Sequence, residues 1–127
     1  MPATDLNHCN YQAPRATIDR LKDFYCLLVG LKVGPRPPLS SFGYWLYAGG
    51  RPVIHLSEEK ADDHRRPFLK STFHHLAFSC SEPEEMEAAL IRHAVPYRRA
   101  HVPGSGDLQL FFQDPAGNGV ELNFAAL

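Results

Sequence analysis

An apolar stripe of helical period predicts a helix in the first half of the chain. The apolar positions follow a spacing of i, i+3, i+6, i+7 and i+10, and they are Ile18, Leu21, Phe24, Tyr25 and Leu28. Residues at this spacing lie on one face of an α-helix, so the face can pack on a sheet. Gly30 follows where a glycine commonly ends a helix.

A second helix is predicted in the other half by its start and its periodicity. The segment 81–84, Ser-Glu-Pro-Glu, has the sequence of a capping box with a proline in the first turn. Residues at helical spacing follow it, and they are Met86, Ala89, Leu90 and His93.

The elements around the two helices recur, which indicates an internal repeat. Three predicted strands have counterparts in the other half, and the pairs are 6–11 with 73–78, 44–47 with 110–113, and 53–56 with 119–122. His8 and His75 are 67 positions apart, and His55 and Glu121 are 66 apart. Two different elements therefore recur at nearly one offset.

This repeat predicts one α+β domain made of two modules, each with a strand, a helix and three further strands. The predicted modules are residues 5–57 and 73–125. The segment 58–72 between them is charged, lacks periodicity and contains Pro67, so we expect it to be a connector.

Composition supports a globular protein and excludes several classes of function. The 127 residues are 44% hydrophobic and 21% charged, and the formal net charge is −1. A near-neutral balance does not favour binding of nucleic acid or of an anionic membrane. No apolar run approaches the roughly 20 residues that span a bilayer, and the first residues do not have the pattern of a signal peptide. Three widely spaced cysteines form no CxxC motif, so we expect a reducing, cytoplasmic compartment.

Strand alternation places one metal-competent side chain on the small or polar face of each of four predicted strands. These side chains are His8, His55, His75 and Glu121. A lone histidine in a strand is usually a hydrogen-bonded residue, but four candidates at equivalent places of a repeat favour a shared metal. Two histidines with one carboxylate suit Fe(II) in an open site, while imidazole with carboxylate also suits zinc or nickel.

Four neighbouring residues are candidates for a substrate pocket. Asn10 shares the face of His8, and Asn123 shares the face of Glu121. Trp45 and Phe111 occupy matched places in the repeat, so they are better pocket candidates than the other aromatic residues near them. The segment 114–118, Asp-Pro-Ala-Gly-Asn, predicts a tight turn between strands.

These residues resemble the vicinal oxygen chelate superfamily, which includes glyoxalase I, type I extradiol dioxygenases, methylmalonyl-CoA epimerase and fosfomycin-resistance transferases. The matching segments cover nearly the whole length of the chain, and they are 6–8, 23–25 with 30–31, 53–56, 75–78 and 112–122. The resemblance implies paired βαβββ modules whose eight strands form an open, cup-shaped mixed sheet around a metal. It also implies His8, His75 and Glu121 as ligands, with the substrate bound through neighbouring oxygens.

The residue at position 55 separates the subfamilies. In the glyoxalase I pattern this place holds a glutamate that binds the metal, and in the epimerase pattern it holds a glutamine. In the extradiol dioxygenase pattern it holds a histidine that is not a ligand and acts as an acid–base group, which suits His55. The dioxygenase pattern also has a tyrosine where this chain has Phe111.

The resemblance therefore implies a metal-dependent enzyme, and an Fe(II) extradiol-type ring-cleaving dioxygenase is the preferred hypothesis. Its catalytic acid–base group would be His55, with a fourth-ligand role for His55 as the other option. A glyoxalase-I-like lyase or isomerase, using Zn, Ni, Mn or Co, is the alternative. A ligand-sequestering resistance protein without catalysis is the third hypothesis. We expect a small-molecule substrate and a homodimer, because sheet edges are usually paired or covered.

Overall fold

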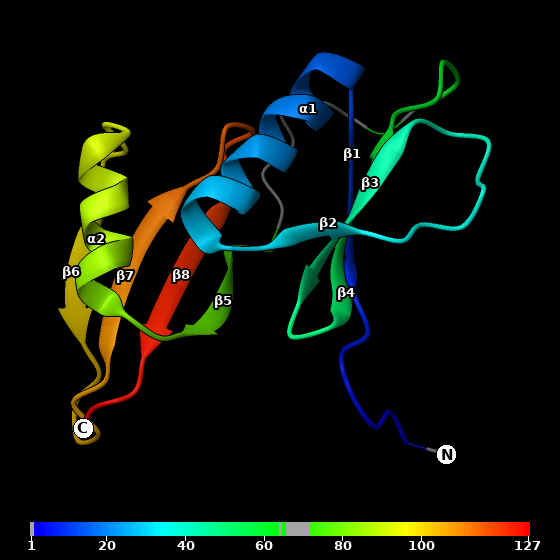
Figure 1. The fold of residues 1–127 in the computed structure, drawn as a ribbon. Helices are drawn as coiled ribbons and strands as arrows, with labels where there is room; N and C mark the ends of the chain where they lie inside the picture. The colour runs from blue at the N-terminus through cyan, green and yellow to red at the C-terminus, as the bar shows by residue number, and fades with distance from the viewer. Residues whose placement is uncertain (1, 64, 66–71) are drawn as a thin grey trace. The chain divides into compact units, whose positions relative to one another are not determined.

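The computed structural model describes residues 2–63, 65 and 72–127 (Figure 1). It divides into two compact units, residues 1–65 and 66–127. The division falls inside the predicted connector 58–72, of which residues 64 and 66–71 lie outside the described residues.

The first unit is a four-stranded mixed sheet with one helix. Its elements are β1 (Cys9–Ala13), α1 (Arg15–Phe24), η1 (Tyr25–Val29), β2 (Lys32–Gly34), β3 (Gly43–Ala48) and β4 (Arg51–Glu58). The strand order is β1-β4-β3-β2. The first and last strands of the unit pair in parallel, and the other pairs are antiparallel.

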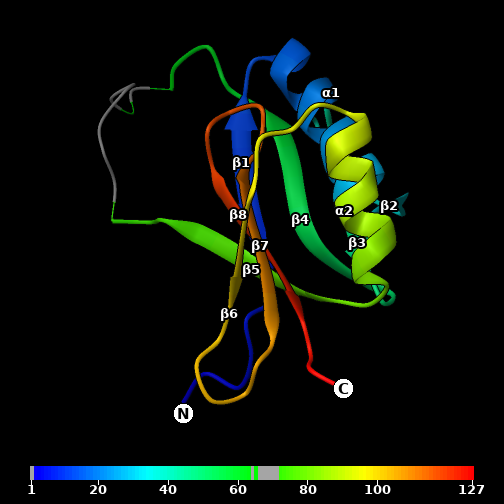
Figure 2. The ribbon, with the colours of Figure 1, turned by 90° about the vertical axis from the view of Figure 1, so that its left-hand side faces the viewer.

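The second unit repeats this architecture strand for strand (Figures 1 and 2). Its elements are β5 (His75–Cys80), α2 (Pro83–Arg92), β6 (Arg98–His101), β7 (Leu108–Gln113) and β8 (Gly119–Phe124). The order is β5-β8-β7-β6, and β5 pairs in parallel with β8. The α+β class and the two βαβββ modules expected from the repeat are thereby confirmed.

The apolar stripe of the first helix is buried as its spacing predicts. Ile18 and Tyr25 are fully buried, and α1 packs against β1, β3 and β4. The helix ends at Gly30, whose φ of +87° is in the left-handed region. Its last turn, η1, is π-helical, which the sequence pattern did not indicate. Because a π turn adds a residue to the turn, Leu28 and Val29 are both buried.

The capping box expected at 81–84 does not form. The helix α2 begins at Pro83, so its N-cap is Glu82 with a φ of +61°, and no side chain caps the first turn. Ser81 stands one residue too early to cap it. The proline at the first helical position is confirmed, and Glu84 and Glu85 in the first turn interact favourably with the helix dipole.

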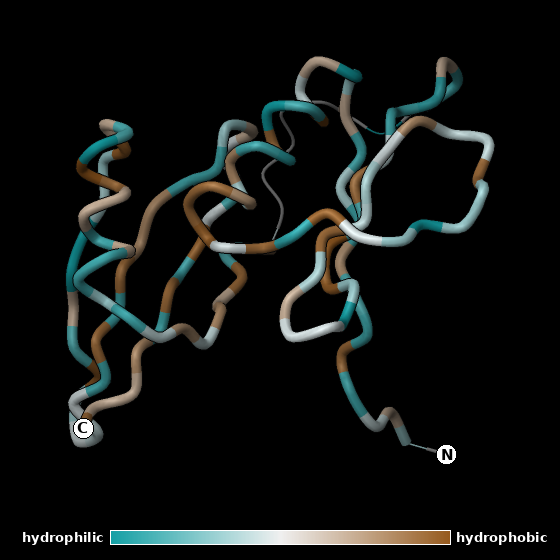
Figure 3. Tube along the Cα trace, in the orientation of Figure 1, coloured by the Kyte–Doolittle hydropathy of each residue, from teal (hydrophilic) through white to brown (hydrophobic). Residues whose placement is uncertain are grey.

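Each unit buries the apolar face of its sheet. The fully buried strand residues in the first unit are Leu46, Ile54 and Leu56, and those in the second are Leu110 and Leu122. Hydrophobic and hydrophilic segments alternate along both helices (Figure 3). The turn expected at 114–118 is confirmed, since Asp114 accepts backbone hydrogen bonds from Ala116 and Asn118.

All three cysteines are free thiols. Among the described residues, no helix combines the length and the apolar character that crossing a bilayer requires.

We predict that Ile54→Ala destabilises the protein by about 2–5 kcal/mol, because Ile54 is fully buried and its loss leaves a cavity in the first unit. Val33→Ala is the control, since Val33 is 51% exposed and its truncation should cost well under about 1 kcal/mol. Urea unfolding followed by circular dichroism measures both changes. Equal effects of the two substitutions would contradict this description of the core.

Candidate functional site

Three aromatic rings stack on the face of the first sheet that carries His55. In the strand register, His55 on β4 lies between Asn10 on β1 and Trp45 on β3. The His55 ring lies 3.9 Å from the Trp45 ring and 3.8 Å from the His8 ring, centroid to centroid. The angles between the ring planes are 8° and 11°. Since β1 and β3 flank β4, His55 is covered by a ring on each side.

The environment of the stack favours the neutral form of His55. Burial of the imidazole lowers the pKa of His55 below its ordinary value of 6.5, and the charges of His8 and Arg36 lower it further. Hydrogen bonding to the Pro52 backbone acts in the other direction and does not offset these effects. The Nε2 atom of His55 is buried and has no hydrogen-bond partner among the described residues. A buried polar atom without a partner is costly in a structural site, so His55 is a functional candidate.

The stacked geometry separates the roles of His8 and His55. A histidine binds a metal through a nitrogen lone pair in the plane of its ring. Two rings lying face to face at 3.8 Å and 11° do not share a plane, so they cannot both bind one ion in this arrangement. In this arrangement at most one of the two histidines could bind a given ion.

His8 is the more accessible histidine of the pair. It immediately precedes β1, whereas the sequence pattern put it inside the strand, and it is exposed. Its Nδ1 atom lies 2.8 Å from Oδ1 of Asn7, which is the kind of contact that fixes the tautomer of a ligating histidine. With the proton on Nδ1, the Nε2 lone pair of His8 is free to bind a metal.

A histidine–carboxylate pair lies at the equivalent place of the second unit. Nε2 of His75, the first residue of β5, lies 3.2 Å from Oε1 of Glu121 on β8. Glu121 is 7% exposed. Its Oε2 atom accepts hydrogen bonds from Gln109 at 3.2 Å and from Asn123 at 3.5 Å. The carboxylate is therefore held by one oxygen while the other faces the imidazole.

His75 is also held from its other side. Its Nδ1 atom lies 2.9 Å from Nδ1 of His74. A Cβ atom at Gly119, which is opposite His75 in the register, would lie 2.3 Å from the carbonyl oxygen of His74. Only a glycine at 119 lets β5 bring His75 this close to β8.

The donor set of the second unit fits a divalent metal. An imidazole nitrogen and a carboxylate oxygen lie side by side, and hydrogen bonds orient the groups that carry them. The structure contains no cluster of three metal-competent side chains within the ranges that it describes. The predicted ligands are divided between the units, with His8 in the first and His75 and Glu121 in the second.

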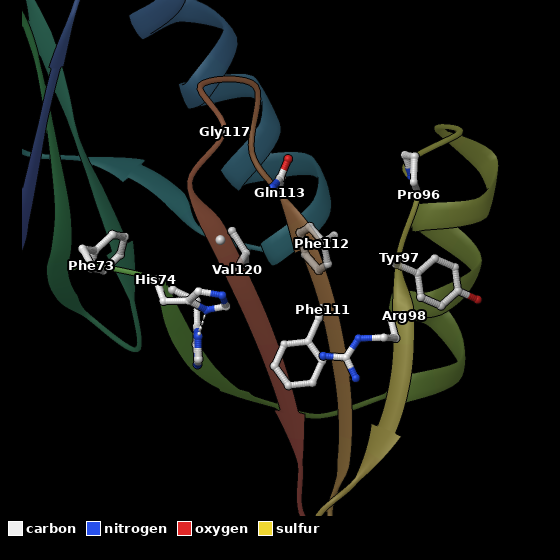
Figure 4. Close-up of a pocket in the computed structure, with 12 residues that line it drawn as sticks. Phe73, His74, Pro96, Tyr97, Arg98, Phe111, Phe112, Gln113, Gly117 and Val120 are labelled. Atoms are coloured by element: carbon white, nitrogen blue, oxygen red, sulfur yellow. Dashed lines mark hydrogen bonds between the residues drawn. The ribbon is translucent and has the colours of Figure 1, made fainter. Parts of the chain in front are cut away.

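A pocket of about 720 Å³ opens on the second unit beside His75 (Figure 4). Phe111 lies opposite Glu121 in the register, and its ring stands edge-on to the His75 ring at 5.9 Å. Arg98 reaches from β6 over the Phe111 ring, 4.4 Å from its centroid (Figure 4). The predicted pocket residue Phe111 thus lines a pocket, whereas Trp45 stacks on His55 and Asn123 binds Glu121. Asn10 is exposed and accepts a hydrogen bond from Ser57 at 3.4 Å.

A comparison of the sequence with family profiles decides the family. The profile of the Glyoxalase/Bleomycin resistance protein/Dioxygenase superfamily matches residues 5–122. The chain belongs to this superfamily. The matched range includes all four candidate residues, from His8 to Glu121.

Several solved structures share the fold of this chain. A glyoxalase family protein from Bacillus anthracis has a TM-score of 0.76 and 21% identity, over 99% of this chain and 98% of that chain. A lactoylglutathione lyase from Agrobacterium tumefaciens has a TM-score of 0.67 and 20% identity, over 98% and 96%. A glyoxalase family protein from Enterococcus faecalis has a TM-score of 0.63 and 22% identity, over 94% and 96%. A search of curated protein sequences gave no significant match.

The sequence pattern did not predict several residues that surround the candidate site. Gln109 and Arg98 were not singled out, although Gln109 lies two positions before Phe111 and so shares its face. The same alternation places Arg98 opposite Phe111, but only once the partner strand is known. The contact of His74 with His75 comes from the chain's entry into β5, which the sequence pattern does not indicate.

We predict that His55 of the metal-free protein titrates below pH 6.5, and that Trp45→Ala raises its pKa toward that value, because the substitution readmits water to the imidazole. A pH titration of the histidine ring protons by NMR measures this pKa. Trp45→Phe, which keeps a ring over His55, is the control and should shift the pKa less.

The lowered pKa of His55 also determines how the stability of the protein changes with pH. Because the folded-state pKa of His55 is below that of the unfolded chain, His55 lowers the free energy of unfolding as pH falls below 6.5. The contribution of His55 to the free energy of unfolding is fully lost once the pH is below its folded-state pKa. A His55 pKa at or above 6.5 in the unsubstituted protein would contradict the stacked, desolvated environment.

Proposed function

We propose that this superfamily member is a metal-dependent enzyme acting on a substrate with neighbouring oxygens, and that it is an Fe(II) extradiol-type ring-cleaving dioxygenase. The observation that carries the proposal is the stack of His8, His55 and Trp45. It supports a neutral histidine that stands next to a ligand without being one, which is the role of this position in the dioxygenase pattern. A glyoxalase-like site would instead use position 55 as a ligand.

The ligands in this proposal are His8, His75 and Glu121. When bound, the metal would act as a Lewis acid on two neighbouring oxygens of the substrate. Two histidines and one carboxylate leave open positions for substrate and dioxygen. The contacts of Glu121 with Gln109 and Asn123 support its role, because they hold the carboxylate in one orientation.

His55 supplies the proton transfer. Its Nε2 atom has no competing partner among the described residues, which supports a role for the imidazole as the proton acceptor. The lowered pKa of His55 favours the unprotonated imidazole. Trp45 and His8 position the ring and do not take the proton.

The alternative function is a glyoxalase-I-like lyase or isomerase with Zn, Ni, Mn or Co. The chain shares its fold with a lactoylglutathione lyase, which is compatible with this alternative. Because the two sequences are 20% identical, the comparison supports a common fold and not a common reaction. A ligand-sequestering protein would need no metal. Metal analysis of the purified protein separates the three hypotheses. Iron favours the dioxygenase, another divalent metal favours the glyoxalase-like enzyme, and no stoichiometric metal favours the ligand-sequestering protein.

We also propose that the protein is a cytoplasmic homodimer. Each four-stranded sheet has two edge strands, and exposed edges are usually paired or covered in soluble proteins. The three free cysteines support a reducing compartment. Each unit supplies part of the proposed ligand set, and one chain or two chains could complete it.

We predict that His55→Ala retains most of its bound metal while turnover of catechols under oxygen falls by about two to four orders of magnitude, the usual effect of losing an acid–base group. His75→Ala should lose metal and activity together, because it removes a ligand. Metal analysis and oxygen uptake measure the two quantities. If His55→Ala loses metal as completely as His75→Ala does, His55 is a ligand and the glyoxalase-like alternative takes precedence.

We predict a dimer by light scattering at micromolar concentration, and a monomer there would refute it. Mixed dimers of His8→Ala and Glu121→Ala chains then test whether ligands are shared. If each site draws on both chains, one of the two sites is intact and metal binding returns to about half. If each site belongs to one chain, both sites stay defective.

A further inference from the structure

The pocket of the second unit contains a cation whose role the proposed reaction does not explain. Arg98 and Arg99 are neighbours on β6, and strand alternation sends them to opposite faces of the sheet. Nε of Arg99 pairs with Oε2 of Glu87 at 3.0 Å, and the hydroxyl of Tyr97 donates to the same oxygen at 2.6 Å. Arg99 is therefore neutralised within the unit.

Arg98 has no such partner. No carboxylate of the described residues pairs with its guanidinium, and the residues outside that description contain no Asp or Glu. The pocket lining includes no acidic side chain either. The Phe111 ring supports the guanidinium from one face, which leaves the N–H groups at its edge free to donate. Paired N–H groups of this kind bind a carboxylate with two parallel hydrogen bonds.

The register sets the distance between this cation and the proposed metal ligands. Glu121, Phe111 and Arg98 lie directly opposite one another on β8, β7 and β6. Neighbouring strands are about 4.8 Å apart, so the backbone of Arg98 stands roughly 10 Å from that of Glu121. The side chain of Arg98 reaches over Phe111 (Figure 4). Its guanidinium therefore lies closer than its backbone to β8, the strand that carries Glu121. One aromatic ring with an acidic substituent fits this span.

We propose that Arg98 is a specificity-determining residue that binds the carboxylate of an aromatic acid, with the ring of that acid against Phe111. The inference rests on the proposed function for the identity of the pocket as a substrate site. It narrows the substrate class to ring compounds that carry a carboxylate in addition to their neighbouring oxygens. Arg98 is exposed, so a carboxylate would replace water at its guanidinium, whereas a neutral catechol supplies no anion to do so.

The test uses benzoate as a probe on the full-length protein, with binding followed by NMR titration. Benzamide has the same ring and no charge, and we expect it to bind at least about tenfold more weakly than benzoate. Arg98→Gln should weaken benzoate binding about tenfold or more and leave benzamide unchanged. Arg98→Lys should restore part of the loss, since it keeps the charge without the paired N–H groups.

Arg99→Gln is the matched control, because it removes an adjacent arginine that faces the other way, and benzoate affinity should stay within about twofold. Repeating the titration after removal of metal by chelation distinguishes binding at Arg98 from binding at a metal ion. Phenylphosphonate, with the same ring and a different anion, tests the preference for a carboxylate. Circular dichroism checks that each variant is folded.

The proposal is overturned if benzoate does not bind, if Arg98→Gln leaves its affinity unchanged, or if benzamide binds as tightly. Loss of benzoate binding on chelation alone, or tighter binding of phenylphosphonate, also overturns it. None of these results depends on turnover or on the identity of the metal. Failure of the dioxygenase proposal, seen as missing iron or absent oxygen uptake, is therefore a separate outcome.

Discussion

Parallel pairing of the first and last strands in each unit is the constraint on which the candidate site depends. β1 lies beside β4 and β5 lies beside β8, so the strand that opens a unit lies next to the strand that closes it. This pairing brings His8 onto His55 and His75 onto Glu121, although more than forty residues separate each pair in the sequence. A shift of one residue in either register would turn one member of the pair to the apolar face.

The same topology produces different chemistry in the two units because the residues at the closing strand differ. In the first unit the closing strand presents an imidazole, and the flanking rings desolvate it. In the second unit the closing strand presents a carboxylate, and amide side chains hydrogen-bond it. One half is thus suited to holding an uncharged base and the other to holding a cation.

Much of this arrangement could be predicted from the sequence, because it depends on period and repetition. Alternation along the strands assigned Glu121 and His55 to a common kind of face, and the helical stripe located Ile18 and Tyr25 in the core. The sequence could not predict the contacts that need a partner strand, such as Gln109 on Glu121 or Arg98 on Phe111. It also could not predict the ring stack, since side-chain packing decides which faces of His8 and His55 meet. The capping box at 81–84 was wrong because the backbone turns to the left-handed region at Glu82, one residue later than the motif implies.

The intrinsic tryptophan fluorescence of this protein comes from Trp45. It is the only tryptophan in the chain, and its indole lies flat against the imidazole of His55. All tryptophan emission therefore originates at one ring of the candidate site. A change in the charge of that imidazole, or its departure from the indole, alters the light that the whole molecule emits. Events at a single buried nitrogen can be followed in solution without attaching a label.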